Sequence, residues 1–404
     1  MKYRATLLLI FLLASSVIRS QTTDEADSLY LNYEFDKAIE LCQNLATRLT
    51  KARKADEAEA LSPLIEKYEK GARMLRHCED VQIIDSLIVD KARFLQAYFI
   101  SSEAGYLEEE NGQLYYINQL GDKRYFSREN KEGYGRIYSE LEYEGQWDDR
   151  ALLNLPYEAG AGYAFPFVMP DGITLYFAST GHGSLGGYDL FVSRYNSAGD
   201  AYLAPTQLGM PFNSPYNDYM LAIDEVNNIG FFATDRFMPE GQVVVYTYIP
   251  NASVKPIDSD DPDYLAKRAR IYDIRDSWQE NRSYYNNYIQ QVKDFIRDER
   301  KTKGYDFTFV INDNIIYHTL DDFVSTAARQ QFRQLQSLDT NIGYTEAELD
   351  AQRKEYSRAS AEGKAGMKTG IEENEHKLLT LQKQRVRMET EVRNLEIREI
   401  RTKN

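Results

Sequence analysis

Hydrophobic residues recur with two different periods along this chain. Over residues 21–100, apolar positions return every three or four residues, which places them on one face of a helix. Over 101–250 they alternate with polar positions and turn residues become frequent, which predicts short strands. An acidic linker follows at 251–263, and helical periodicity returns over 264–345 and 346–404. We therefore expect several domains, with strands in the middle of the chain and helices on either side.

The N-terminal region carries apolar stripes of helical spacing. One runs over residues 35–49 and another over 83–95, so helices are predicted in both places. The stretch 26–39 resembles one unit of a tetratricopeptide repeat, with a Tyr at the helix end and a Phe-Asp-Lys-Ala restart. Later segments lose this pattern, and such units need stacked neighbours to bury their faces. A helical bundle is therefore an equal alternative for residues 21–100.

A strand-like motif occurs three times in the middle region. Each copy is followed by a partner motif, after a connection that contains glycine. The copies recur at intervals of about fifty residues, the spacing that β-propeller blades produce. We therefore expect a partial antiparallel β-propeller of about three blades. The first motif occurs at 125–127, 176–179 and 231–234, and its partner at 137–139, 190–193 and 245–247.

The middle copy of this repeat is the clearest. A tight turn is predicted at its Pro-Asp-Gly sequence, because Pro sets a negative φ, Asp can accept bonds from its own backbone and Gly accepts a positive φ. A glycine pair later precedes a strand, with an Asp placed to bind loop amides. The residues that define this copy are Pro170, Asp171, Gly172, Tyr176, Phe177, Gly186, Gly187, Asp189 and Phe191.

This string resembles the WD40-like β-propeller repeats of TolB-type envelope proteins. The segment 208–218 is also similar to the blade-to-blade link of proteins that join helical repeats, such a propeller and often an OmpA-like domain, including components of type IX secretion. The resemblance implies a scaffold of the cell envelope. The chain departs from the pattern in two respects. It shows three copies where propellers usually close with four or more, and no OmpA-like sequence follows, so peptidoglycan binding of that kind is not expected.

The C-terminal region contains a heptad pattern and a short pair of strands. A β-hairpin is predicted at 305–318. The final segment is predicted to form a coiled coil with another chain, or a hairpin against 345–361; the alternative is one solvated charged helix. Gly363, Gly366 and Gly370 are predicted to form a hinge at its start. The apolar seam positions are Ile371, Leu378, Leu381, Met388, Val392 and Leu395.

The first twenty residues have the pattern of a signal peptide. Lys2 and Arg4 precede an apolar core at 5–14, which is too short to cross the roughly 30 Å hydrocarbon layer as a helix. No second apolar run of spanning length follows. We therefore expect cleavage after residue 20 and a location in the periplasm or at the outer membrane, with the membrane reached only through a partner.

The two cysteines, Cys42 and Cys78, would enter an oxidising compartment and could form a disulfide. Such a bridge would contribute on the order of 3 to 4 kcal/mol. Cys42 also lies on the apolar stripe of its predicted helix, so a buried free thiol is the alternative.

The charge and the motifs of the chain limit the ligands and cofactors that we expect. Lys and Arg number 48 against 63 Asp and Glu, and the net charge of −15 disfavours nucleic acid. The sequence 181–186 fits a dinucleotide fingerprint, but a strand rather than a helix is expected after it. The four histidines lack ligand spacing. We therefore expect no cofactor and no metal.

These observations favour a non-enzymatic adaptor that binds other envelope proteins, with self-assembly through the C-terminal helix as an open alternative. The 31 tyrosines of the chain leave a carbohydrate- or peptidoglycan-binding module as the competing hypothesis, because tyrosine rings can stack on sugars. A hydrolase on a propeller scaffold is disfavoured, because no acid, base and nucleophile converge on any motif.

Overall fold

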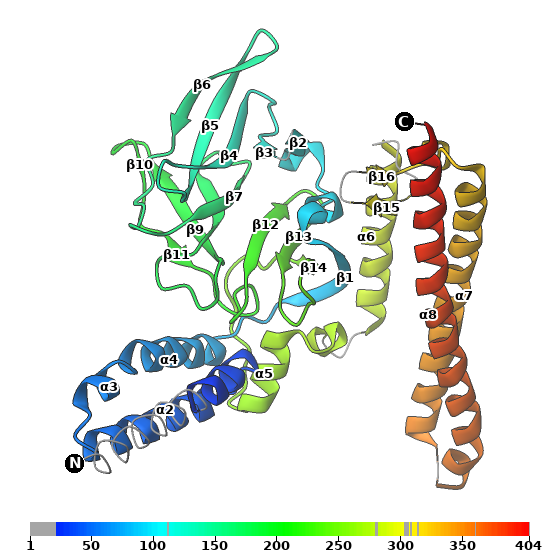
Figure 1. The fold of residues 1–404 in the computed structure, drawn as a ribbon, viewed down its shortest axis with the longest axis horizontal. Helices are drawn as coiled ribbons and strands as arrows, with labels where there is room; N and C mark the ends of the chain where they lie inside the picture. Colours follow the sequence, from blue (N-terminus) through cyan, green and yellow to red (C-terminus); the bar gives the residue numbers. More distant parts are fainter. Residues whose placement is uncertain are drawn as a thin grey trace, which may run out of the picture. The chain divides into compact units, whose positions relative to one another are not determined.

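A computed structural model describes residues 22–110, 113–278, 282–302, 307, 309–312, 315–359 and 361–403. The chain divides into two compact units, Met1–Phe295 and Ile296–Asn404. It has mixed α and β structure, with antiparallel sheets in the middle and helices before and after them (Figure 1). This combination confirms the predicted fold class at that level. The predicted signal peptide, residues 1–20, lies outside the described residues.

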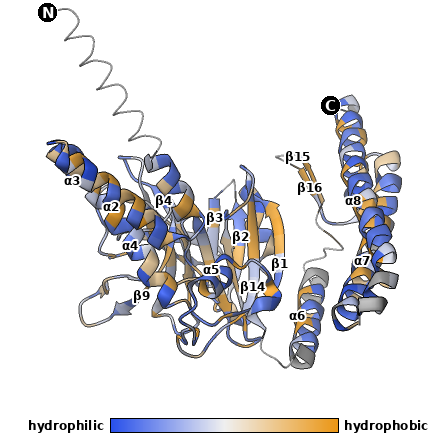
Figure 2. Cartoon of the chain, turned by 90° about the horizontal axis from the view of Figure 1, so that it is seen from below, coloured by the Kyte–Doolittle hydropathy of each residue, from blue (hydrophilic) through white to orange (hydrophobic). Residues whose placement is uncertain are grey.

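The N-terminal helices are amphipathic and share one core. They comprise a helix at residues 22–31, α2 (Phe35–Lys51), the short α3 (Ala55–Glu59) and α4 (Ser62–Arg76). Figure 2 shows apolar and polar residues alternating around α2 and α4. The ring of Phe35 packs so closely on α4 that a Cβ at Gly71 would lie 2.7 Å from it. Glycine therefore lets the two helices approach each other at this point.

Cys42 and Cys78 are free thiols in this structure. Both side chains are buried in the core that the helices share. Cys42 lies on the buried face of α2, and Cys78 follows the C-terminal end of α4. Each therefore packs as a small apolar residue, and burial raises the pKa of both thiols.

Three larger antiparallel sheets follow. The first has the order β2-β3-β4-β5-β6, and the second the order β10-β9-β8-β7, with β11 also pairing with β9. The third has the order β1-β14-β13-β12. Their strands are β1 (Gln82–Asp90), β2 (Tyr106–Glu110), β3 (Gln113–Ile117), β4 (Lys123–Glu129), β5 (Gly135–Tyr143), β6 (Gln146–Leu152), β7 (Tyr163–Val168), β8 (Thr174–Ser179), β9 (Asp189–Asn196), β10 (Ala201–Tyr202), β11 (Thr206–Gln207), β12 (Asp218–Asp224), β13 (Ile229–Thr234) and β14 (Gln242–Ile249).

The repeated sequence motifs occupy equivalent places in the three sheets. The first motif lies in β4, β8 and β13, and its partner lies in β5, β9 and β14. In each sheet these two strands are antiparallel neighbours. The sequence repeat therefore corresponds to a repeated pair of strands.

The third sheet is completed by a strand from before the first sheet. β1 pairs antiparallel with β14 over its whole length. The predicted helix at 83–95 is wrong, because this segment is β1 followed by the 3-10 helix η1 (Lys91–Ala97). Adjacent pairs such as Ile83-Ile84 fit both periods, and β-branched residues favour a strand where a sheet edge is available. The predicted boundary between the helical region and the strands, at residue 100, therefore lies after the first strand of the sheets.

The sheets pack face to face through aromatic side chains. Between the first and second sheets, the rings of Tyr116 and Phe167 lie 4.8 Å apart, and Tyr116 Oη donates to Val168 O at 2.6 Å. Between the second and third sheets a separate core contains Phe212, Phe232 and other apolar residues. The two interfaces give the sheets a continuous series of buried contacts.

A fully buried ion pair lies in the third sheet. Arg236 Nη2 donates to Asp218 Oδ1 at 2.9 Å, and both side chains are 0% exposed. The same guanidinium donates to Pro211 O and to Ala269 O, the latter at 3.0 Å. Asp218 also accepts from Ser214 N at 2.7 Å. The pair therefore joins this sheet to the helix that contains Ala269.

One face of the first sheet carries arginines around Glu140. Arg124 Nε and Arg150 Nε each donate to one Glu140 oxygen at 2.8 Å. The Arg124 guanidinium lies 4.0 Å from the ring centroid of Tyr115 and 4.7 Å from that of Trp147. Exposure is 4% for the Glu140 side chain, 12% for Arg124 and 48% for Arg150. This network is partly open to solvent.

Two helices and a 3-10 turn follow the third sheet. They are α5 (Pro262–Arg270), η3 (Ile274–Ser277) and α6 (Arg282–Thr302). α5 begins within the predicted acidic linker, because Asp261 accepts from Asp263 N and Tyr264 N and Pro262 follows as the first helical residue. Tyr288 Oη of α6 donates to Asn228 O, between β12 and β13, at 2.6 Å.

The second unit contains a small hairpin and two long helices. The elements are β15 (Phe309–Asn312), β16 (Ile315–Tyr317), η4 (Leu320–Asp322), α7 (Thr326–Arg358) and α8 (Ala361–Lys403). The hairpin packs on the two helices in one apolar cluster. Part of the predicted hairpin at 305–318 lies outside the described residues. Glu396 is 0% exposed and accepts from Tyr317 Oη at 2.6 Å and Ser325 N at 3.0 Å, which satisfies its buried carboxylate.

The heptad of α8 faces α7 of the same chain. Its seam positions are buried or half-buried, and Val392 is 0% exposed. Arg385 Nε donates to Asp339 Oδ1 at 2.7 Å across the pair. The hairpin alternative is therefore the one observed, but α7 extends well before 345. The predicted glycine hinge is wrong, because Gly363 and the two later glycines lie inside α8. Assembly with another chain stays a prediction.

Candidate protein-binding pocket

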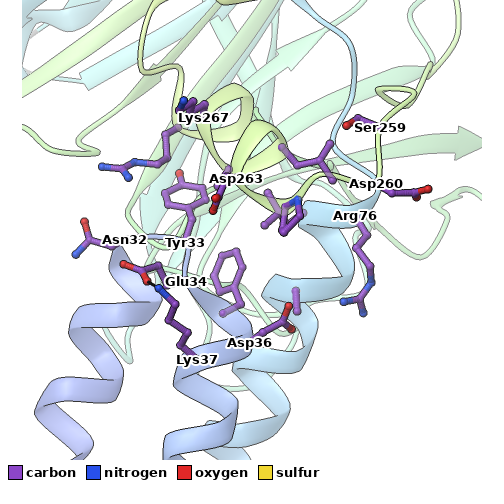
Figure 3. Close-up of a pocket in the computed structure, with 17 residues that line it drawn as sticks. Asn32, Tyr33, Glu34, Asp36, Lys37, Arg76, Ser259, Asp260, Asp263 and Lys267 are labelled. Atoms are coloured by element: carbon purple, nitrogen blue, oxygen red, sulfur yellow. Dashed lines mark hydrogen bonds and ion pairs between the residues drawn. The ribbon is translucent and has the colours of Figure 1, made fainter.

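An open pocket of 780 Å³ lies beside the N-terminal helices (Figure 3). Its walls come from three places in the sequence: the linker and first turn at 32–37, the end of α4, and the segment 259–270 that includes α5. Ligand pockets usually measure about 300–1,000 Å³. The size is therefore suitable for a few side chains of a partner.

The floor of the pocket is apolar. Phe35 at the start of α2, Ala72 and Leu75 on α4, and Leu265 on α5 line it, and each is less than a tenth exposed. They belong to the core cluster that joins the three helices. The amphipathic stripes of α2, α4 and α5 thus meet at this floor, because each helix turns its apolar face to the same core.

Tyr33 lies in the wall between the first helix and α2. It has a φ of 64°, a left-handed conformation that is uncommon for a residue with a bulky side chain. This conformation ends the first helix, because Tyr33 N donates to Tyr30 O and Glu34 N donates to Leu29 O, both at 2.9 Å. The ring is buried, and burial raises the pKa of its hydroxyl. Among the described residues that hydroxyl has no hydrogen-bond partner.

The rim of the pocket carries charges of both signs. Lys37 forms an ion pair with Glu34, as the dashed line in Figure 3 shows. Asp260 and Arg76 lie on the side of the view opposite Lys267 (Figure 3). These three residues are exposed and form no ion pair with the residues that the structure describes. Exposed charges of this kind contribute little free energy each, but they restrict which partners can approach.

One cation of the pocket is held on an aromatic ring. The Arg270 guanidinium lies 5.0 Å from the ring centroid of Phe237. Phe237 has a φ of 57° and is 42% exposed, and its ring contacts those of Tyr33 and Tyr216 at 6.3 Å and 5.1 Å. Arg270 Nε is buried and has no hydrogen-bond partner in the described part of the chain. Among the described residues the guanidinium therefore has an aromatic contact and no salt bridge.

The predicted motif residues do not line this pocket. Pro170, Asp171 and Gly172 form the turn between β7 and β8, where Asp171 accepts from Ile173 N at 2.8 Å and Gly172 has a φ of 68°. These residues shape the second sheet.

The remaining motif residues lie in and beside the loop before β9. Asp189 is 0% exposed and accepts from Leu185 N at 3.0 Å and Gly186 N at 3.2 Å, as its position predicts. Tyr176 and Phe177 lie in β8, and Phe191 lies in β9 beside Phe177, with 6.0 Å between the ring centroids. This part of the repeat therefore packs the sheets and holds a loop.

A hydrogen-bonded chain lies near the rejected nucleotide fingerprint. Tyr163 Oη and His182 Nε2 are 2.7 Å apart, and His182 Nδ1 lies 3.5 Å from Glu158. This order of groups is known from catalytic relays. Tyr163 is 0% exposed, however, so no substrate can reach its oxygen. The chain links the loop after β8 to the segment before β7, which is a structural role.

Several tyrosines of the sheets are buried, whereas Tyr106 and Tyr143 are exposed. Tyr116, Tyr163 and Tyr248 are at most 2% exposed, and burial raises their pKa values. Their rings are therefore not open for stacking on sugars. In the described residues no group of three His, Cys, Asp or Glu could hold a metal ion. The same part of the chain contains no helix that is long and apolar enough to cross a membrane.

The pocket could not be found from the sequence motifs. Its residues are separated by more than two hundred positions and share no motif. The nearest signal is the tetratricopeptide-like stretch, which includes Tyr33 and Phe35. No protein-family model matches the chain, and no curated protein matches it at a significant level. The function is therefore argued from the geometry of the chain itself.

Proposed function

We propose that this protein is a non-enzymatic scaffold of the cell envelope that binds a partner polypeptide in the pocket between α2, α4 and α5. The observation that supports this most directly is the combination of an open apolar floor with an exposed rim of both charges. An apolar floor can bury one or two partner side chains, while the rim selects the partner by its charge pattern.

The three sheets support the scaffold part of the proposal. Each has a repeated strand pair, successive sheets pack on one another, and β1 supplies the last strand of the third sheet. These features support a partial propeller of three blades. Such an arrangement holds the helical region and the pocket on a rigid support, because α5 is bonded to the third sheet through Arg236.

The envelope location is the part of the proposal that rests on the sequence. It depends on the signal-like residues 1–20 and on the resemblance to TolB-type repeat proteins. The proteins that these repeats resemble include components of type IX secretion, so the scaffold would serve an assembly related to secretion. Protein-protein interaction with other envelope components is therefore the activity to be tested.

Site-specific cross-linking in intact cells tests the proposal. A photo-reactive amino acid at Asn32, which is exposed on the pocket wall, should give a discrete adduct with another polypeptide. Filling the pocket with Ala266→Trp should remove that adduct. Ala198→Trp, in the exposed turn after β9, is the matched control and should leave it unchanged. An adduct that persists in Ala266→Trp, with the fold intact by circular dichroism, would contradict the proposal.

A further inference from the structure

Arg270 differs from the other cations that line the pocket. Lys37, Arg76 and Lys267 are exposed, and Lys37 is already paired with Glu34. Arg270 is half-buried, its Nε is shielded from solvent, and Phe237 supports its guanidinium. A partly desolvated cation interacts more strongly with an opposite charge than an exposed one does. Among these cations it is therefore the best placed to contribute binding free energy.

The guanidinium of Arg270 is also supported by an aromatic ring. Its central carbon lies 5.0 Å from the ring centroid of Phe237, and this contact limits the side-chain freedom that is lost when a partner binds. Arg presents parallel N–H groups that match the two oxygens of a carboxylate. The geometry of Arg270 therefore suits a planar anionic group.

Three residues with a left-handed backbone lie in the segments around this arginine. Tyr33, Phe237 and Ile271 all have φ values between 54° and 64°, and Ile271 directly follows Arg270 at the end of α5. Left-handed conformations of such bulky residues cost free energy and persist where the surrounding structure requires them. Here the ring of Phe237, which contacts that of Tyr33, lies against Arg270, and Arg270 and Tyr33 line the pocket.

The carboxylates of the rim do not cancel the preference of Arg270 for an anionic group. Asp36, Asp260 and Asp263 are exposed and form no ion pair with Arg270 in the described residues. Their charges are screened by solvent, so they contribute less than a half-buried group does. The strongest unsatisfied charge of the pocket is therefore positive, although the whole chain is acidic.

We propose that Arg270 binds a side-chain carboxylate of the partner polypeptide, an Asp or Glu that lies beside an apolar residue seated on the pocket floor. The inference rests on the proposed function, because it names the chemistry that the same pocket recognises. The carboxylate pairs with the guanidinium over Phe237, and the neighbouring apolar side chain contacts Phe35 and Leu265. A free C-terminal carboxylate has the same chemistry, and the experiment below distinguishes the two sources.

Selection from a peptide library tests this inference with the purified full chain. The probe is a bead-displayed library of ten-residue peptides with acetylated and amidated ends. The unmodified protein should enrich peptides with Asp or Glu next to Leu, Ile or Phe by about tenfold over the input. Arg270→Ala should lose the acidic enrichment and keep the apolar one, and Arg270→Glu should enrich Lys or Arg instead. Arg128→Ala, at an exposed position on β4, is the control and should behave like the unmodified protein.

The outcomes separate this inference from the proposed function. Apolar enrichment without an acidic preference, or an acidic preference that Arg270→Ala retains, would overturn the role of Arg270 while the pocket remained a polypeptide-binding site. Enrichment that appears only in a second library with free C-terminal carboxylates would overturn the side-chain source. No enrichment of any peptide would contradict binding in the pocket itself. Thermal unfolding of each variant verifies that the fold is retained.

Discussion

Two ionic clusters in the sheets show how burial changes the role of the same chemistry. Arg236 and Asp218 lie at 0% exposure in the third sheet, and the guanidinium also binds backbone carbonyls of neighbouring segments. Glu140 in the first sheet is also buried, but one of its two arginines, Arg150, is 48% exposed. The first cluster joins separate parts of the unit, whereas the second covers one face of a single sheet. Loss of a partner should therefore have very different effects in the two places.

The largest effect is expected from Arg236→Met. This change leaves the Asp218 carboxylate buried without its cation, a change that usually costs about 3–5 kcal/mol. Urea denaturation followed by circular dichroism should show the loss. Adding Asp218→Asn should restore part of the stability, because the unpaired charge is then removed. If Arg236→Met unfolds at the same urea concentration as the unmodified protein, the buried pair does not hold the sheets in this way.

Two glycine substitutions compare the room around the backbone in two places: between the second and third sheets, and in a turn of the first sheet. A Cβ at Gly186 would lie 1.6 Å from Tyr216 O, between the second and third sheets. Gly186→Ala should therefore cost about 2–3 kcal/mol, since the backbone must move. Gly145, in the turn between β5 and β6, has open space around it but a φ of 82°, so Gly145→Ala should cost only about 1 kcal/mol. Equal losses in thermal unfolding would contradict the close approach of Gly186 to the Tyr216 backbone.

Because Asp189 is buried, we expect the free energy of unfolding to depend on pH. Burial, with a further effect of Asp218, raises the pKa of Asp189 from 3.8 to about 7. Between these values the folded state holds a proton that the unfolded state has released, so stability should fall as the pH rises from about 4 to about 7. The free energy of unfolding at pH 5 and pH 8 should differ less in Asp189→Asn than in the unmodified protein. An unchanged pH slope would show that Asp189 is ionised throughout.

The smallest effect is expected from Arg150→Ala on the first sheet. Half of the Arg150 side chain is exposed, and Glu140 keeps its bond to Arg124. The expected loss is at most about 1 kcal/mol, as for other exposed ion pairs, and added salt should reduce it. Urea denaturation at low and high salt measures both effects. A loss as large as that of Arg236→Met would remove the distinction between the two clusters.

The sequence predicted those parts of the fold that depend on local patterns. The three strand pairs, the turn at Pro170 to Gly172 and the heptad of α8 each have a period or a turn sequence of their own. The strand β1 was missed because its apolar spacing fits a helix as well, and only its pairing with β14 decides between them. For α8 the heptad left a partner chain and a hairpin against 345–361 as alternatives, and it did not show that α7 begins at Thr326.

The candidate site could not be predicted in the same way. Tyr33, Phe237 and Arg270 come from a helix linker, a strand connection and a helix end, and none belongs to a motif with the others. Their common feature is a contact that exists only when the third sheet and the helices are assembled. Buried charges such as Arg236 could not be predicted either, because the sequence alone does not show which arginine becomes buried.

The pairing of β1 with β14 has a consequence for the order in which the protein is made. β1 leaves the ribosome before any other strand of the three sheets, and its neighbour β14 is the last of them to appear. A row of Ile and Val residues with unpaired backbone groups must therefore wait until residues 91–249 have been made, and such edges associate readily with other chains. Any fragment that starts after β1 would transfer this open edge to β14, even if every later residue were retained.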